Sequence, residues 1–206
     1  MIKQFCADTA LLVIDVQKGV DVLEHWGGKT GRRNNPEAEK HIGQILEEAR
    51  AKGLAIVYTA HDSRESDSPL KLSEPGGDFK DGLGPREGEE VFEKGVNSGF
   101  IGTGLEIALQ HRGISRLLVV GFFTNMCVDT TVRMAGNMGF DTYLVHDACA
   151  CTNRIGQDGT DYDAELIHNT SIANLHGEFC TALSTVEALE LLSRDVGELK
   201  RMQGNE

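Results

Sequence analysis

Four helix-to-strand joints share one local pattern, and this repetition constrains the fold more than any other feature of the chain. The joints read AKG-LAIVY, HRG-ISRLLVV, NMG-FDTYLV and LHG-EFC. In each joint a glycine stands just past the helix, where a residue with a left-handed backbone closes the helix end. The chain therefore alternates helix and strand, and this alternation predicts a parallel sheet with helices on both faces.

The hydrophobic pattern predicts the elements themselves. The first strand lies in TALLVIDVQ, a continuous apolar run typical of a strand covered on both faces. Further strands are expected at 54–60, 90–95, 116–122, 141–147 and 178–183, and helices at 36–52, 103–112, after Cys127, 161–176 and 184–195. Thr103 and Glu106 match a capping box at the start of the second helix. We expect a three-layer α/β/α fold around a six-stranded parallel sheet, with 1–206 forming a single domain.

Composition and charge exclude several classes of protein. The net charge is −12 and no basic block is present, which argues against nucleic acid and anionic membrane surfaces as partners. The apolar run 10–14 is too short to span a membrane, and the N-terminus lacks the apolar region of a signal peptide. The five scattered cysteines do not form a disulfide framework, so we expect a cytoplasmic protein.

The stretch 61–90 is polar and rich in glycine and proline, and its 30 residues exceed what a simple connection needs. It is expected to be a functional lid or an interface loop. The alternative is a solvated insertion without a role.

Three reactive side chains follow predicted strands. Asp15 ends the first strand, Lys94 follows the third and Cys127 follows the fourth. Ligands of parallel sheets bind beyond the carboxyl ends of the strands, so these groups are expected to share a cleft. Asp15 and Lys94 form either an ion pair that only ties two strands together or a working part of the site.

Cys127 is expected in the first turn of a helix, where the helix dipole and a nearby ammonium favour the thiolate. A nucleophile with a carboxylate base and a cation would support covalent catalysis. Cys127 as a small buried apolar residue remains the alternative. A cysteine–histidine pair with His61, His146 or His168 also remains open, and the other four cysteines are interpreted as structural.

Three sequence blocks resemble the signature blocks of the isochorismatase-like cysteine hydrolases. The blocks are ALLVIDVQ, EKGVNSGFIGTGLE and VVGFFTNMCVDTTVRMAGNMGFDTYLVHDA, in the family's order and spacing. The resemblance covers roughly 8–192. It implies a six-stranded parallel sheet flanked by helices, a Cys-Asp-Lys triad, and hydrolysis of C–N bonds in small amides or ureido compounds.

The resemblance also assigns roles to residues. It implies that Cys127 attacks the carbonyl carbon, that Asp15 takes the thiol proton and passes it to the leaving amine, and that Lys94 holds charge and geometry. It further implies a cis peptide between Phe122 and Phe123. The backbone N–H groups of Phe123 and Cys127 would then form an oxyanion hole.

Departures from the family pattern narrow the expected activity. Nicotinamidases carry a D-x-H metal motif after the second strand, whereas this chain has YTAHDSRES there, so neither a metal nor another cofactor is expected. Isochorismatases proper act on a vinyl ether and several lack the cysteine, so Cys127 counts against that activity. A vinyl-ether hydrolase and a catalytically silent binding or scaffold protein remain the alternatives.

Substrate contacts are predicted more loosely. Gln17 either points into the site or caps a loop, and Trp26 is either a pocket wall or a surface anchor. Arg154 either binds a carboxylate or is solvated. The residues expected to contact a small amide or ureido substrate are Gln17, Trp26, His61, Phe123 and Asn125. The resemblance also implies a homodimer or homotetramer.

Overall fold

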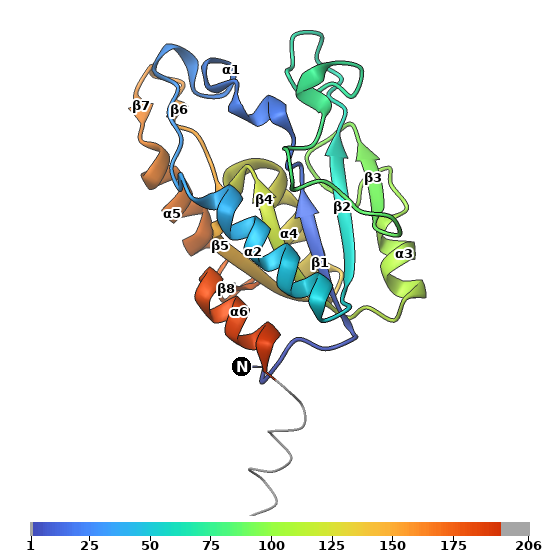
Figure 1. Ribbon diagram of the computed structural model, residues 1–206. Helices are drawn as coiled ribbons and strands as arrows, with labels where there is room; N and C mark the ends of the chain where they lie inside the picture. The colour runs from blue at the N-terminus through green and yellow to red at the C-terminus, as the bar shows by residue number, and fades with distance from the viewer. Residues whose placement is uncertain (1, 195–206) are drawn as a thin grey trace, which may run out of the picture.

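A six-stranded, all-parallel sheet forms the centre of the molecule (Figure 1). The computed structural model describes residues 2–194. The strand order is β3-β2-β1-β4-β5-β8, and the six parallel strands confirm the predicted fold class. The strands are β1 (Thr9–Ile14), β2 (Ala55–His61), β3 (Glu90–Lys94), β4 (Arg116–Phe122), β5 (Asp141–Ala150) and β8 (Thr181–Leu183).

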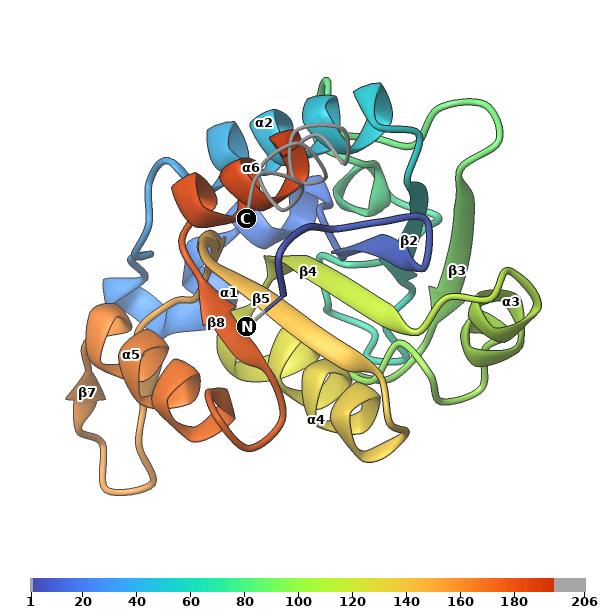
Figure 2. The same ribbon diagram turned by 90° about the horizontal axis from the view of Figure 1, so that it is seen from below.

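Helices cover both faces of this sheet and complete three layers. Figure 2 shows α2 (Ala38–Ala51) and α6 (Thr185–Ser193) on one side, and α4 (Asp129–Asn137) and α5 (Ala164–Leu175) on the other. The helix α3 (Leu105–His111) packs on the second side, beside β3. The final residue of the helix predicted at 184–195 lies outside the described residues.

The central strand β1 shows why its sequence is continuously apolar. Every residue of β1 is buried. Leu11 and Val13 pack in the core beneath α2 and α6, while Leu12 and Ile14 pack in the core beneath α3 and α4. Successive side chains of a strand point to opposite faces, so a sheet covered on both sides requires apolar residues at every position.

The four glycine joints are confirmed. The glycine after each helix has a positive φ, at 66° for Gly53, 67° for Gly113, 89° for Gly139 and 85° for Gly177. The repeated pattern therefore marks four helix ends correctly, because a left-handed backbone at these positions favours glycine.

The predicted capping box at the start of α3 is wrong. The helix begins at Leu105 with Gly104 as its N-cap, and Thr103 lies one residue too early. The Thr103 hydroxyl instead donates to Gly99 O at 2.6 Å and accepts from Leu105 N at 3.3 Å. A complete capping box is present at α6, where Ser184 and Glu187 exchange hydrogen bonds.

Several short elements escaped the sequence pattern. The chain after β1 forms η1 (Lys18–Asp21), α1 (Leu23–Gly27) and η2 (Gly28–Thr30). A small antiparallel hairpin, β6 (Arg154–Ile155) and β7 (Asp161–Tyr162), follows β5. These segments are too short to show a hydrophobic period.

The strand order reverses at β1, and this reversal creates a crevice. The chain proceeds outward from β1 to β3, and β4 then pairs with the other side of β1. Such a switch point is where open parallel sheets bind ligands. At this point Gly121 has φ 129°, and a Cβ there would lie 2.1 Å from Ile14 O.

No helix within 2–194 is both long enough and apolar enough to cross a membrane.

Candidate active site

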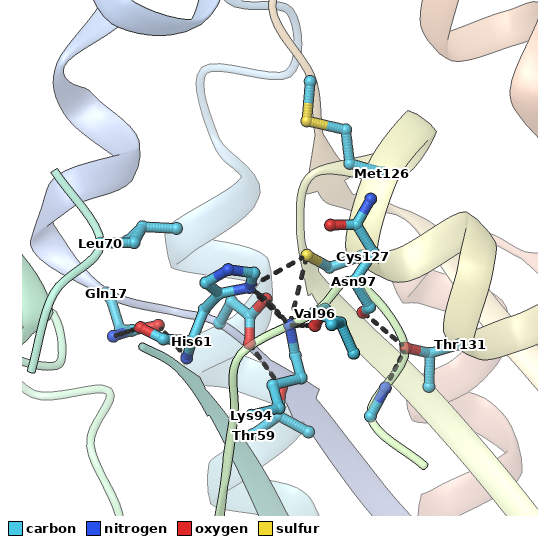
Figure 3. A network of polar contacts seen from close by, with 12 residues as sticks. Gln17, Thr59, His61, Leu70, Lys94, Val96, Asn97, Met126, Cys127 and Thr131 are labelled. Atoms are coloured by element: carbon cyan, nitrogen blue, oxygen red, sulfur yellow. Dashed lines mark hydrogen bonds and ion pairs between the residues drawn. The ribbon is translucent and has the colours of Figure 1, made fainter. Parts of the chain in front are cut away.

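The carboxyl ends of four neighbouring strands bring the reactive groups together. Asp15 follows β1, His61 ends β2 and Lys94 ends β3. Cys127 lies in η4 (Thr124–Val128), a π-helical turn between β4 and α4. Figure 3 shows Lys94, His61 and Cys127 pointing toward one another. The three reactive residues predicted from the sequence, Asp15, Lys94 and Cys127, therefore lie in one place.

Asp15 is buried in an unusual backbone conformation. Its side chain is 1% exposed and its φ is 49°, a left-handed value that non-glycine residues adopt rarely. The Thr59 hydroxyl donates to Oδ1 at 2.6 Å, and the Lys94 ammonium donates to Oδ2 at 2.7 Å. These partners compensate the cost of burying the carboxylate.

Lys94 is the centre of the network. Its Nζ lies 2.7 Å from Asp15 Oδ2, 2.9 Å from His61 Nδ1, 3.1 Å from Val96 O and 3.3 Å from Cys127 Sγ. Burial lowers the pKa of Lys94, but Asp15 and Cys127 outweigh burial, and the pKa is raised. Lys94 is therefore a buried ammonium at neutral pH.

The sequence predicted that the helix dipole and a nearby ammonium favour the thiolate of Cys127, and Lys94 does act in this direction, but burial and Asp15 oppose it. Burial raises the pKa of the Cys127 thiol, and the Asp15 carboxylate raises it further, while Lys94 offsets only part of the increase. The residue is 7% exposed. The resting group is therefore a thiol, and it needs a base to become a nucleophile.

His61 belongs to the same network. The sequence left a pairing of His61 with Cys127 open, but it did not predict the contact of His61 with Lys94. Its Nδ1 accepts from Lys94 and lies 3.7 Å from Cys127 Sγ. Burial, followed by the charge of Lys94, lowers the pKa of His61. The ring is therefore neutral, with its proton on Nε2, because Nδ1 is occupied as an acceptor.

A cleft of about 290 Å³ opens beside the sulfur. Trp26, Phe123 and Met126 form part of its wall, and residues of the loop 62–89 form another part, including Ser63, Glu65 and Leu70. The loop at 61–90 that the sequence singled out therefore contributes directly to the cleft.

The structure places most, but not all, of the predicted contact residues at the cleft. Trp26, His61, Phe123 and Arg154 line it. The Trp26 ring centroid lies 5.2 Å from that of Phe123, and Arg154 Nη1 donates to Trp26 O at 2.7 Å. Arg154 thus supports the tryptophan wall as well as facing the cleft.

Gln17 and Asn125 do not line the cleft. The Gln17 side chain accepts from His61 N at 2.8 Å and donates to His61 O at 3.1 Å and to Gly77 O at 2.9 Å. It therefore holds the end of β2 and the loop at 77, which is the loop-capping alternative. The Oδ1 atom of Asn125 is buried without a hydrogen-bond partner.

The donor set does not fit a metal ion. Asp15, His61 and Cys127 offer ligand atoms within 4.8 Å of one another. The Lys94 ammonium, however, contacts all three groups at hydrogen-bond distance. It occupies the place that a cation would take, so these residues do not form a metal centre.

The turn that carries Cys127 has two further features. The peptide bond between Phe122 and Phe123 is cis, as the family resemblance implies. His168 of α5, one of the three histidines that the sequence left open as partners of Cys127, is buried with Nδ1 2.9 Å from Thr124 Oγ1 and Nε2 3.5 Å from Asn35 Nδ2. His168 therefore contacts the first residue of η4, the turn that carries Cys127.

The chain belongs to the isochorismatase family. The model of the isochorismatase domain matches residues 9–187. The isochorismatase family protein YrdC of Bacillus subtilis is 44% identical over 85% of this chain and 91% of its own length. A streptothricin hydrolase of Streptomyces noursei is 32% identical, covering 68% of this chain and 49% of its own. The ureidoacrylate amidohydrolase RutB of Acinetobacter baylyi is 28% identical over 68% and 70% of the two chains.

Solved structures agree with this assignment. A hydrolase of the isochorismatase family from Chromobacterium violaceum superposes with a TM-score of 0.84 at 40% identity, covering 92% of this chain and 96% of that chain. The family resemblance and the fold class predicted from the sequence are thus confirmed, and the chain is an isochorismatase-family hydrolase.

Proposed function

We propose that this chain is a cysteine-dependent hydrolase that cleaves a C–N bond of a small amide or ureido compound through a thioester. One observation carries the proposal. Cys127 Sγ lies 3.3 Å from the Lys94 ammonium, and it lies within 4.8 Å of a carboxylate oxygen of Asp15. A thiol beside a buried carboxylate has a base in place to take the proton that it must lose before it attacks.

The proposed reaction has two halves. Asp15 accepts the thiol proton while Cys127 Sγ attacks the carbonyl carbon, and the backbone N–H groups of Phe123 and Cys127 stabilise the oxyanion. Asp15 then gives the proton to the leaving nitrogen as the C–N bond breaks. Water attacks the thioester, with Asp15 again accepting a proton, and the thiol is restored. Lys94 keeps Asp15 oriented and offsets the negative charge on sulfur.

Two relatives support the choice of substrate class. One is a ureidoacrylate amidohydrolase and another is a streptothricin hydrolase. Trp26, His61, Phe123 and Arg154 are the proposed substrate contacts, because they line the cleft beside the sulfur.

A substrate panel tests the proposal. Small amides, ureido acids and biuret-like compounds are supplied to the wild-type chain and to Cys127→Ser, and ammonia release is measured. We expect release only from the wild type, together with an acyl adduct on Cys127 detected by mass spectrometry during turnover. Pyruvate release from isochorismate, with no ammonia from any amide, would instead support the vinyl-ether activity.

We further propose that the chain acts in the cytoplasm as a homodimer or homotetramer, without a nucleic-acid partner. All five cysteines are free, which suits a reducing compartment. The apolar side chains of Val91, Ile101 and Ile107 are exposed by 39%, 51% and 59%, and they would be covered by association. Light scattering on the purified chain measures the oligomeric state, and a monomer at micromolar concentration would contradict this proposal.

A further inference from the structure

We propose that His61 is a positioning residue that competes with Cys127 for the hydrogen-bond donors of Lys94, and so keeps the resting sulfur as a neutral thiol. This inference rests on the proposed role of Cys127 as the nucleophile. It adds a function for a residue outside the Asp15, Lys94 and Cys127 group.

The argument begins with a count of donors and acceptors. A lysine ammonium carries three N–H donors. Four acceptors surround Lys94 Nζ, namely Asp15 Oδ2, His61 Nδ1, Val96 O and Cys127 Sγ. Because three N–H groups cannot fully serve four acceptors, one of the four always lacks a full hydrogen bond from Lys94. A neutral thiol sulfur is the weakest acceptor of the four, and it has the longest distance, 3.3 Å.

His61 is held firmly enough to compete. It pairs with Lys94 across the β2–β3 register, so the two side chains leave neighbouring strands at the same level. Both its backbone N–H and its carbonyl oxygen are hydrogen-bonded to the Gln17 side chain. These hydrogen bonds fix the end of β2. The Gln17 side chain therefore has a structural role and not a role in direct substrate contact.

The ring of His61 is an acceptor at neutral pH. The charged and titratable groups that face it are Lys94, Asp15 and Cys127, together with Asp62 and Glu65 from the following loop. Burial and Lys94 outweigh the carboxylates and lower the pKa of the ring. The ring therefore stays neutral, with Nδ1 available to Lys94.

The same arrangement explains how the sulfur gains its donor during attack. When the thiol proton moves to Asp15, the sulfur becomes an anion and a strong acceptor. His61 Nδ1 lies only 3.7 Å from Sγ, so a small rotation of the ammonium moves one N–H from the ring to the sulfur. No covalent bond to Lys94 changes, and the proton count is conserved.

Two substitutions separate this role from simple packing. His61→Leu fills much of the ring's volume but removes the acceptor, whereas His61→Asn keeps an amide oxygen near the position of Nδ1. The measurement is the rate at which iodoacetamide alkylates Cys127 near pH 7.5 without substrate, followed by peptide mass spectrometry. We expect about a tenfold faster alkylation in His61→Leu, equivalent to a thiol pKa about one unit lower, and a wild-type rate in His61→Asn.

The opposing explanations predict different results. Added apolar surface alone raises the thiol pKa and slows alkylation, so a His61→Leu rate at or below wild type would overturn the inference. Equal acceleration in both variants would indicate wider access to the sulfur and would overturn it as well. His61→Met carries the same prediction as leucine and replaces it if His61→Leu fails to fold. Because alkylation needs no substrate, the result is independent of whether any amide is hydrolysed.

Discussion

At the scale of single residues, a substitution of Asp15 should have the largest effect on the protein. It is buried, has a left-handed backbone, and meets both the Thr59 hydroxyl and the Lys94 ammonium. The Thr59 hydroxyl and the Lys94 ammonium stabilise the buried carboxylate, and the carboxylate in turn is the acceptor for both of these buried donors. If Asp15 is the base of the proposed mechanism, replacing it affects catalysis and stability together.

Asp15→Asn should reduce kcat/KM by about 10³–10⁴-fold, because the base is lost, and it should destabilise the fold by about 3–5 kcal/mol, because the Lys94 ammonium is left buried without its counter-charge. Steady-state kinetics and urea unfolding measure the two effects. Thr59→Val is the matched control, since it removes one hydrogen bond to Asp15 and keeps the charge. A stable, active Asp15→Asn chain would contradict the proposed role.

His168 makes the fold sensitive to acid. Burial is the main cause that lowers the pKa of His168 from its ordinary 6.5 to about 4. Between these values the unfolded chain binds a proton that the folded chain does not, so stability falls as the pH drops through this range. The loss of unfolding free energy between pH 7 and pH 5 should be about 2 kcal/mol smaller in His168→Gln than in the wild type.

Urea unfolding at both pH values measures this difference. His111→Gln is the control, because His111 is exposed at the end of α3. An identical pH dependence in His168→Gln and the wild type would contradict the prediction.

At the scale of elements, the close contact between β1 and β4 determines where η4, the turn that carries Cys127, begins. Gly121 lies just before the cis peptide, and a side chain there would clash with the backbone of Ile14. The register between β4 and β5 also shifts after Val119. The end of β4 is thus shaped by backbone packing rather than by side chains.

Gly121→Ala should therefore destabilise the chain by more than about 4 kcal/mol or prevent folding. Gly113→Ala is the matched control, because Gly113 also has a positive φ but has no atom within 4 Å of a Cβ. The control should lose only about 1 kcal/mol. Thermal and urea unfolding measure the loss of stability in each variant. An equal loss in both would show that the positive φ, and not the clash with Ile14, causes the destabilisation.

The sequence predicted the elements with regular hydrophobic patterns and the residues at their ends. Asp15, Lys94 and Cys127 could be named because strand ends of a parallel sheet share one edge. The contact between His61 and Lys94 could not, since it depends on the β2–β3 register, which apolar strands do not specify in a local pattern. The resting state of Cys127 was also out of reach, because it depends on burial by segments distant in the chain.

At the scale of the whole molecule, an ionic cluster joins four segments next to Phe122, which lines the cleft. Arg33 pairs with Glu39 of α2 at 2.6 Å, Lys80 of the loop 62–89 pairs with Glu39 at 3.0 Å, and both cations contact Asp21 of η1. Arg33 and Lys80 also lie over the Phe122 ring, at 5.3 Å and 5.8 Å from its centroid. The cluster links the segments that bear the cleft walls to Phe122, the last residue of β4 before the turn that carries Cys127.

Glu39→Gln should weaken this link. Burial raises the pKa of Glu39, but Arg33 and Lys80 outweigh it and lower the pKa, so the carboxylate is charged at neutral pH. Its loss should cost about 1–2 kcal/mol of unfolding free energy, given the partial exposure of the cluster. In Glu39→Gln, the rate of backbone hydrogen exchange should rise in 15–34 and 62–89 and stay at the wild-type rate in β5. Wild-type exchange rates in all three regions would contradict the prediction.

The size of the cleft limits what the enzyme can handle. The cleft volume of about 290 Å³ lies at the small end of the range for small-molecule sites, which is about 300–1,000 Å³. A compound of amino-acid dimensions fits within it, whereas a peptide or polysaccharide would have to project through the mouth. Turnover should therefore decline as chemical groups are added to the end of a substrate remote from the scissile bond.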